Sequence, residues 1–170
     1  MGMEKKKWTS IKEGAGNGGL LILGKKPTPL PDQTFISLTR GEGLNFAQLI
    51  INQVFTLLVM NQMRKTPGLL YAEVGGELKR GRGNGQTMTV WDGKMMPKLR
   101  NQGTHHFAMK FFGWVIHRKN TQTYYLTYSA GEKIPSMEEA REIVKEHGKF
   151  YDQGRLVRKA TPPKIDVNIS

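Results

Sequence analysis

The order of strand-type and helix-type segments constrains the fold of this chain more than any other feature. Strand-type patterns, rich in β-branched and aromatic residues, cover residues 34–39, 69–74, 86–91 and 121–129. Helix-type patterns cover residues 44–64 and much of 94–112, although Pro97 must then lie near the start of the second helix. The chain is therefore predicted to form a mixed α+β domain.

A third helix is predicted after Pro135, because Ser136 and Glu139 have the spacing of a capping box. This helix is expected to bury Ala140 and Val144 and to end near Gly148, with a short final strand at residues 155–158. The resulting order, β-α-β-β-α-β with a further helix, is typical of a ferredoxin-like fold.

The helix predicted at residues 44–64 has a narrow polar stripe on an otherwise apolar surface. Its polar positions are Asn45, Gln48, Asn52 and Thr56, which recur at helical spacing. Such a stripe predicts a helix that is buried on more than one side. Polar residues interrupt the apolar run from Leu49 to Met60, and the run is shorter than the ~20 residues that a membrane span needs. We therefore expect no membrane span and a cytoplasmic protein.

Length and composition favour one domain with tails. The 170 residues suit a single core, predicted at residues 27–160, with a flexible basic tail at 1–26 and a second tail at 161–170. The chain has no cysteine, which excludes disulfides, thiolate zinc sites and thiol nucleophiles.

The net charge of +12 raises the possibility of a polyanionic partner such as nucleic acid. More than half of this excess lies near the ends of the chain, with +4 in residues 1–26 and +3 in residues 149–170. Solvated tails and a nucleic-acid-binding arm are both consistent with that distribution.

Two adjacent histidines stand in the most aromatic stretch of the chain, residues 103–114. His105 can act as a ligand or acid/base group, or cap the core as a structural histidine. Met109 and Phe112 fall on its side of a helix, whereas His106 points about a quarter-turn away. Neighbouring helix positions do not face each other, so a site with two histidine ligands is disfavoured.

Three aromatic residues and one basic loop complete the candidate site. Trp91, Trp114 and Tyr124 either line a ligand pocket or belong to the core, and Met109 either faces a cofactor or fills a gap. Residues 79–85 are predicted to form a glycine-rich, flexible hairpin loop. Its Arg80 and Arg82 offer charges for haem propionates or an anionic substrate.

Four segments of the chain resemble a domain family related to spheroidene monooxygenase and, more distantly, to the antibiotic-biosynthesis monooxygenases. They are residues 66–70, 87–91, the Gly103-x-His-x-x-x-Met109 pattern, and 125–140, within a match over roughly residues 34–160. The resemblance implies a dimeric α+β barrel in which each subunit gives a four-stranded sheet with helices on one face. It also implies haem bound through a single histidine, a position that falls on His105.

The function expected from this resemblance is that of a small-molecule enzyme of the monooxygenase-like barrel group, with haem-dependent oxygenation through His105. Trp91, Phe112, Trp114 and Tyr124 would shape the substrate pocket of a homodimer. The alternatives are a haem-free barrel enzyme that uses His105 or a tyrosine for acid/base chemistry, or a non-catalytic module that binds a polyanion.

Overall fold

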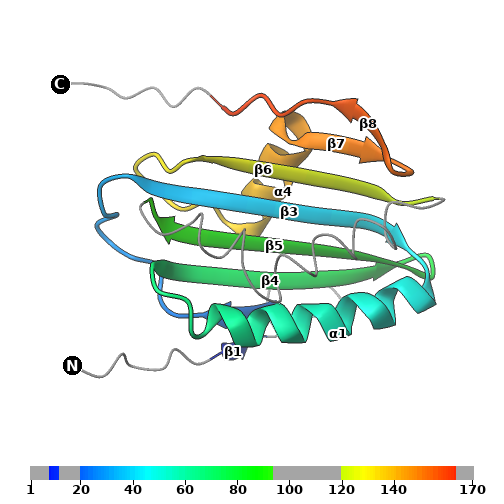
Figure 1. Ribbon diagram of the computed structural model, residues 1–170, viewed down its shortest axis with the longest axis horizontal. Coiled ribbons are helices and arrows are strands. Elements are labelled where there is room, and N and C mark those ends of the chain that lie inside the picture. The colour runs from blue at the N-terminus through cyan, green and yellow to red at the C-terminus, as the bar shows by residue number, and fades with distance from the viewer. Residues whose placement is uncertain (1–7, 12–19, 94–119, 164–170) are drawn as a thin grey trace.

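The computed structural model describes residues 8–11, 20–93 and 120–163, and these form a mixed α+β structure around one antiparallel sheet. Eight strands lie in the order β1-β2-β4-β5-β3-β6-β7-β8 (Figure 1). Their bounds are Trp8–Ile11 (β1), Leu20–Leu23 (β2), Thr34–Leu44 (β3), Leu69–Lys79 (β4), Arg82–Asp92 (β5), Gln122–Ser129 (β6), Lys149–Asp152 (β7) and Arg155–Arg158 (β8).

The chain crosses over one strand as it passes from β3 to β4. Helix α1, Phe46–Met63, connects these two strands, and β5 pairs with both of them from the middle. This arrangement is a split βαβ unit. The second described helix, α4 (Met137–His147), lies across the opposite side of the sheet from α1 (Figure 1).

The sheet face that α4 covers, the α4 face, holds the larger core. Alternate residues of β3, β5 and β6 point to it, so Ile36, Leu38, Met88, Val90 and Leu126 pack beneath Ala140 and Val144. The predicted capping box is confirmed, since the Glu139 backbone N–H donates to Ser136 Oγ (3.1 Å) and the Ser136 N–H donates to Glu139 (2.7 Å). In β5, Met88 and Val90 point to this face, whereas Thr87 and Trp91 point to the opposite one.

The opposite face, the α1 face, has a second and smaller core at one end. Met63 of α1 packs there with Leu23, Leu69, Ala72 and Trp91. Along the rest of its length α1 packs loosely. Its apolar side chains Phe46, Ile50, Val54, Leu57 and Leu58 are exposed, and the prediction of burial on more than one side is wrong. The physical reason is that α1 turns its polar stripe toward the sheet together with Leu49, Met60 and Met63, and leaves the rest of its apolar surface exposed.

Two segments predicted to be loop or tail belong to the sheet. Residues 79–85 are not a flexible loop, because β4 and β5 continue to a two-residue turn in which Arg80 and Gly81 both have positive φ. This is the geometry of a type I′ hairpin turn, whose twist matches that of the flanking strands. In the predicted tail at 1–26, β1 and β2 extend the sheet, and Leu23 is fully buried.

The remaining differences concern the number of strands and the helices. The resemblance implies four strands with helices on one face, whereas the sheet has eight strands and the two described helices lie on opposite faces. The helix predicted within residues 94–112 lies outside the described residues.

Candidate functional site

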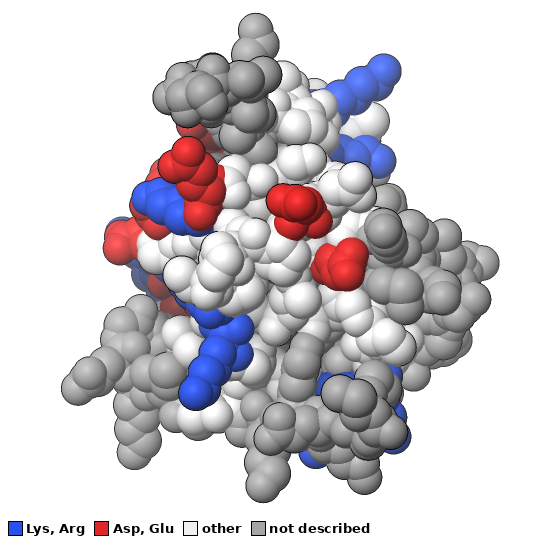
Figure 2. Space-filling view, turned by 90° about the vertical axis from the view of Figure 1, so that its left-hand side faces the viewer, with Lys and Arg blue, Asp and Glu red and all other residues white. Residues whose placement is uncertain are grey.

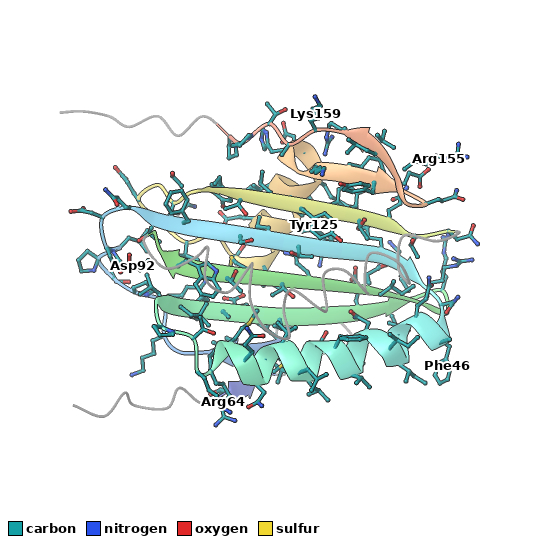
Figure 3. The ribbon with its side chains drawn as sticks, in the orientation of Figure 1. Phe46, Arg64, Asp92, Tyr125, Arg155 and Lys159 are labelled. Carbon is teal, nitrogen blue, oxygen red and sulfur yellow. The ribbon has the colours of Figure 1, made fainter. Side chains whose placement is uncertain are left out.

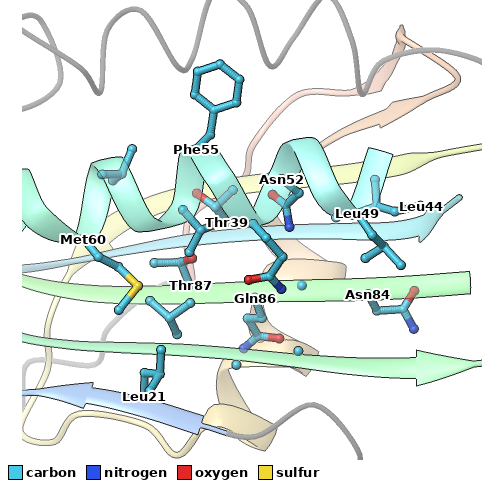
Figure 4. Close-up of a pocket in the computed structure, with 18 of the residues that line it drawn as sticks. Leu21, Thr39, Leu44, Leu49, Asn52, Phe55, Met60, Asn84, Gln86 and Thr87 are labelled. Carbon is cyan, nitrogen blue, oxygen red and sulfur yellow. The ribbon is translucent and has the colours of Figure 1, made fainter. Parts of the chain in front are cut away.

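A pocket of about 400 Å³ lies between α1 and the α1 face of the sheet. Figure 4 shows Leu49 and Met60 extending from α1 toward the strands, while Phe55 points away from them. The volume of the pocket falls within the range of about 300–1,000 Å³ that is usual for small-molecule sites. We refer to it as the α1 pocket. Apolar side chains form most of its wall, including Leu21, Leu44, Leu49, Val59, Met60, Met63 and Val74.

A row of three glycines accounts for the depth of the α1 pocket. Gly41 of β3 pairs with Gly85 of β5, which pairs in turn with Gly76 of β4. All three line the pocket, so the strands present no side chain at this level. A Cβ atom at Gly41 would meet nothing within 4 Å, and one at Gly85 would lie 3.6 Å from the Asn52 amide nitrogen. The glycine row thus leaves space that side chains would otherwise fill.

Neutral hydrogen-bonding groups are aimed into this apolar hollow. They come from both walls, with Asn52 and Thr56 on α1 and Thr39 and Thr87 on the strands. All four side chains are only partly exposed, and within the described residues none of them has a hydrogen-bond partner. These four side chains are therefore available to bind a ligand or water.

Ionisable groups at the pocket are held in uncharged or paired forms. Burial raises the pKa of Tyr125 to about 12, so its hydroxyl stays protonated at neutral pH. Glu77 accepts hydrogen bonds from Arg40 (3.2 Å) and Asn84 (3.2 Å). Burial alone would raise the Glu77 pKa, but those bonds and the charges of Arg141 and Arg40 hold it below its usual value. The pocket therefore favours an uncharged ligand over an ion.

Among the residues predicted from the sequence, the ones on strands do not form one site. Trp91 lies in the core of the α1 face, where its indole N–H donates to Thr89 (2.8 Å). Tyr124 lies on the α4 face and stacks on Phe150 at 4.7 Å between ring centroids. In the register of the paired strands, Trp91 and Tyr124 fall on alternate positions. They therefore point to opposite faces of the sheet and do not line a common pocket.

The other predicted site residues lie apart from the α1 pocket or outside the described residues. Arg80 and Arg82 lie at the exposed β4–β5 turn, where Arg82 donates to the Gly43 carbonyl (3.2 Å). Neither lines the pocket. His105, His106, Met109, Phe112 and Trp114 all lie outside the described residues, so their predicted roles stay predictions.

One sequence pattern marks the pocket, although it was interpreted as a sign of a helix buried on more than one side. The polar stripe on the helix at 44–64 contains Asn52 and Thr56, which line the α1 pocket, and Gln48, which is buried. The glycine row gave no such signal, because Gly85 stands in a basic, glycine-rich stretch that is typical of a loop.

No set of three or more histidines, cysteines or carboxylates suited to a metal ion occurs in the part of the chain that the structure describes. In comparisons with known proteins, no family model matches this chain and no curated protein matches it well enough to show a relationship. The family resemblance drawn from the sequence therefore stays a prediction.

Proposed function

We propose that this protein binds a small, uncharged and largely apolar molecule in the α1 pocket. The observation that carries the proposal is the set of four unpaired amide and hydroxyl side chains, Thr39, Asn52, Thr56 and Thr87, in an apolar hollow floored by glycine. Apolar walls supply affinity by burial, and a few convergent polar groups fix the orientation of the ligand.

The strand order supports the predicted ferredoxin-like topology for the centre of the sheet. The four strands predicted from the sequence appear as β6-β3-β5-β4, with β5 inserted between β3 and β4. In that topology the pocket lies where a helix crosses the sheet, as expected for an enzyme of the monooxygenase-like group. The α4 helix covers the other face, which the implied dimeric barrel would need for closure, so we propose the topology without that closure.

Haem does not fit the described part of the α1 pocket on its own. No described lining residue is a histidine, and neither arginine proposed for the propionates reaches the wall. A haem ligand would have to come from His105, outside the described residues. When bound, haem would supply oxygen activation, and the described residues would supply only apolar walls.

Among the described residues that line the α1 pocket, the groups that could act as an acid or a base are Tyr125 and Glu77. Tyr125 is half-buried, and its raised pKa of about 12 makes it a hydrogen-bond donor rather than a base near neutral pH. The Glu77 carboxylate is held ionised by Arg40 and Asn84 on its far side. The pocket as described is suited to binding and orientation of a neutral molecule.

A polyanion-binding module remains the second candidate, on the basis of the net charge of +12. On the end of the sheet seen in Figure 2, however, the basic and acidic side chains form small separate groups rather than one continuous basic surface. Because a nucleic-acid site needs clustered cations, this view favours the small-molecule proposal.

Filling the pocket tests the proposal. Gly41→Leu places a side chain in open space without a backbone clash, and Ser129→Leu adds the same side chain at an exposed position on the same face outside the pocket. We expect the neutral fluorescent probe 1-aminoanthracene to bind the unaltered chain saturably, and Gly41→Leu to weaken that binding at least about ten-fold, a change of about 1.4 kcal/mol. Ser129→Leu should leave binding unchanged. Equal binding by all three proteins, or by none, would exclude the α1 pocket as the site.

Haem dependence has a separate test in the visible spectrum of the full chain purified from haem-supplemented cells. The haem prediction requires a Soret band that is lost in His105→Ala and kept in His106→Ala. A colourless protein that also fails to take up hemin would rule out haem and leave the neutral-ligand proposal standing.

A further inference from the structure

The outer surface of α1 is unusual for a helix on a protein surface, because apolar side chains are exposed to solvent along it. Phe46 is 76% exposed and Leu57 is 62% exposed, and Ile50, Val54 and Leu58 are exposed between and beside them. These five positions follow the spacing of one helical face. Two of the polar residues of α1, Asn52 and Thr56, are turned inward to the α1 pocket instead. We call these five side chains the outer α1 face.

Basic residues stand at both ends of this uncharged face. Residues 46–63 contain no charged residue at all, and Arg64 and Lys65 follow directly at the C-terminal end. Figure 3 shows Phe46 and Arg64 at the two ends of α1, both directed away from the sheet. At the N-terminal end, Arg82 donates to the carbonyl of Gly43, two residues before the helix cap, and Arg80 lies beside it in the turn.

This charge pattern discriminates between the surfaces that could cover the outer α1 face. In a pair of α1 helices from two copies, either relative direction places basic residues opposite basic residues, since both ends carry them. The net charge of +12 per copy adds to that repulsion. An anionic surface instead neutralises both ends at once while the middle buries apolar side chains.

The length and composition of α1 are consistent with contact between this helix and lipid. By those two criteria α1 is apolar and long enough to cross a membrane, and only 17% of it is buried. In the folded structure, however, α1 lies along the sheet with Gln48, Met60 and Met63 buried, and its inner side lines the α1 pocket. A helix held in this way can lie flat in the interface of a bilayer, with one apolar side buried in the headgroup region.

We propose that the outer α1 face docks on an anionic lipid surface, with Arg64, Lys65, Arg80 and Arg82 against the headgroups. The proposal does not depend on the ligand in the α1 pocket, because four of the five side chains of the outer α1 face do not line that pocket and only Leu57 also reaches its wall. Binding then combines an apolar contribution, which salt does not weaken, with an electrostatic contribution, which salt screens.

Flotation of the full chain with vesicles tests this docking. Vesicles of phosphatidylcholine with phosphatidylserine are compared with vesicles of phosphatidylcholine alone, and we expect clear preference for the anionic ones. Val54→Glu, which does not line the α1 pocket, should weaken binding at least about ten-fold, whereas Val157→Glu, at an exposed position on β8, should not. Circular dichroism of both variants confirms that each one is folded.

A second pair of variants separates docking from adsorption by net charge. Arg64→Glu with Lys65→Glu, at the end of α1, should weaken binding more than Arg155→Glu with Lys159→Glu, which makes the same charge change at the far edge of the sheet (Figure 3). Equal weakening within either matched pair would show adsorption by net charge and overturn the proposal. So would a lack of vesicle binding, or a dimer in sedimentation that Val54→Glu dissociates.

Discussion

Arg40 shows how a buried charge is accommodated at the level of single residues. Its side chain is 4% exposed, and the guanidinium donates to Glu42 (2.6 Å), Gln86 (3.1 Å) and Glu77 (3.2 Å). Lys145 of α4 also pairs with Glu42 (3.0 Å). Burial would raise the Glu42 pKa, but hydrogen bonds from Lys145 and Arg40 outweigh it and the pKa lies below its usual value. These contacts fix β3, β4, β5 and α4 to one another.

Removal of Arg40 should therefore be costly. We expect Arg40→Met to lower the free energy of unfolding by about 3 kcal/mol, because two partly buried carboxylates lose the guanidinium and keep only Lys145 and Asn84 as partners. Lys133→Met is the matched control, since the Lys133–Glu139 pair (3.0 Å) is exposed and should contribute less than about 1 kcal/mol. Urea denaturation of both variants measures the difference. Equal losses would mean that the Arg40 contacts add nothing specific.

The capping box of α4 makes a prediction about pH. The backbone N–H of Ser136, with help from Lys133, lowers the pKa of Glu139 from 4.5 to about 2. A lowered pKa means that the ionised form stabilises the folded chain above about pH 4.5, and that this contribution disappears as the pH falls toward 2. NMR titration of the Glu139 carboxyl should give the lowered value, and Ser136→Ala should raise it. A carboxyl that titrates near 4.5 in the unaltered chain would contradict the capping box.

At the level of the elements, α1 turns its polar stripe toward the sheet and exposes part of its apolar surface to solvent. The sequence predicted its position within two residues at each end, because the apolar period and the stop before Pro67 are local signals. It did not predict which side faces the sheet. That choice depends on the glycine row across β3, β5 and β4, and such a row exists only once the strands pair in the observed register.

Two glycines beneath α1 should respond oppositely to the same substitution. A Cβ at Gly83 would overlap the Leu49 side chain of α1, so Gly83→Ala should destabilise the fold by about 1–3 kcal/mol. A Cβ at Gly41 meets only the open pocket, so Gly41→Ala should stabilise the strand by about 0.5 kcal/mol. Thermal unfolding of the two variants tests this. A destabilised Gly41→Ala would show that the α1 pocket is already filled.

At the level of the whole molecule, patterns within one strand or helix were predictable and patterns between elements were not. The strand pattern at 86–91 lies within β5, and Ser136 marked the start of α4. Strands β1 and β2 were missed because a glycine-rich, lysine-rich stretch has little local preference, and they form only by pairing, β2 with β4 and β1 with β2. Trp91 and Tyr124 were assigned to one pocket because sequence distance does not specify which face of the sheet each residue occupies.

The basic N-terminal segment allows a test that separates folding from polyanion binding. Deletion of residues 1–26 removes β2, whose Leu23 is fully buried against Ala72, so we expect a clear loss of stability in urea denaturation. Deletion of residues 1–7 removes three lysines without removing either strand, and should leave stability unchanged. If the unaltered chain bound nucleic acid with a steep salt dependence and the shorter deletion weakened that binding, the polyanion-binding alternative would be favoured.

The central claim is that a neutral molecule binds between α1 and the glycine row, and NMR titration of the isotope-labelled full chain with 1-aminoanthracene tests it most directly. We expect saturable shifts of the backbone amides of Gly41, Gly76 and Gly85, with little change at Ala140 and Val144 in the core beneath α4. Shifts that concentrate around α4, or an absence of saturable shifts at the three glycines, would contradict the assignment of the site.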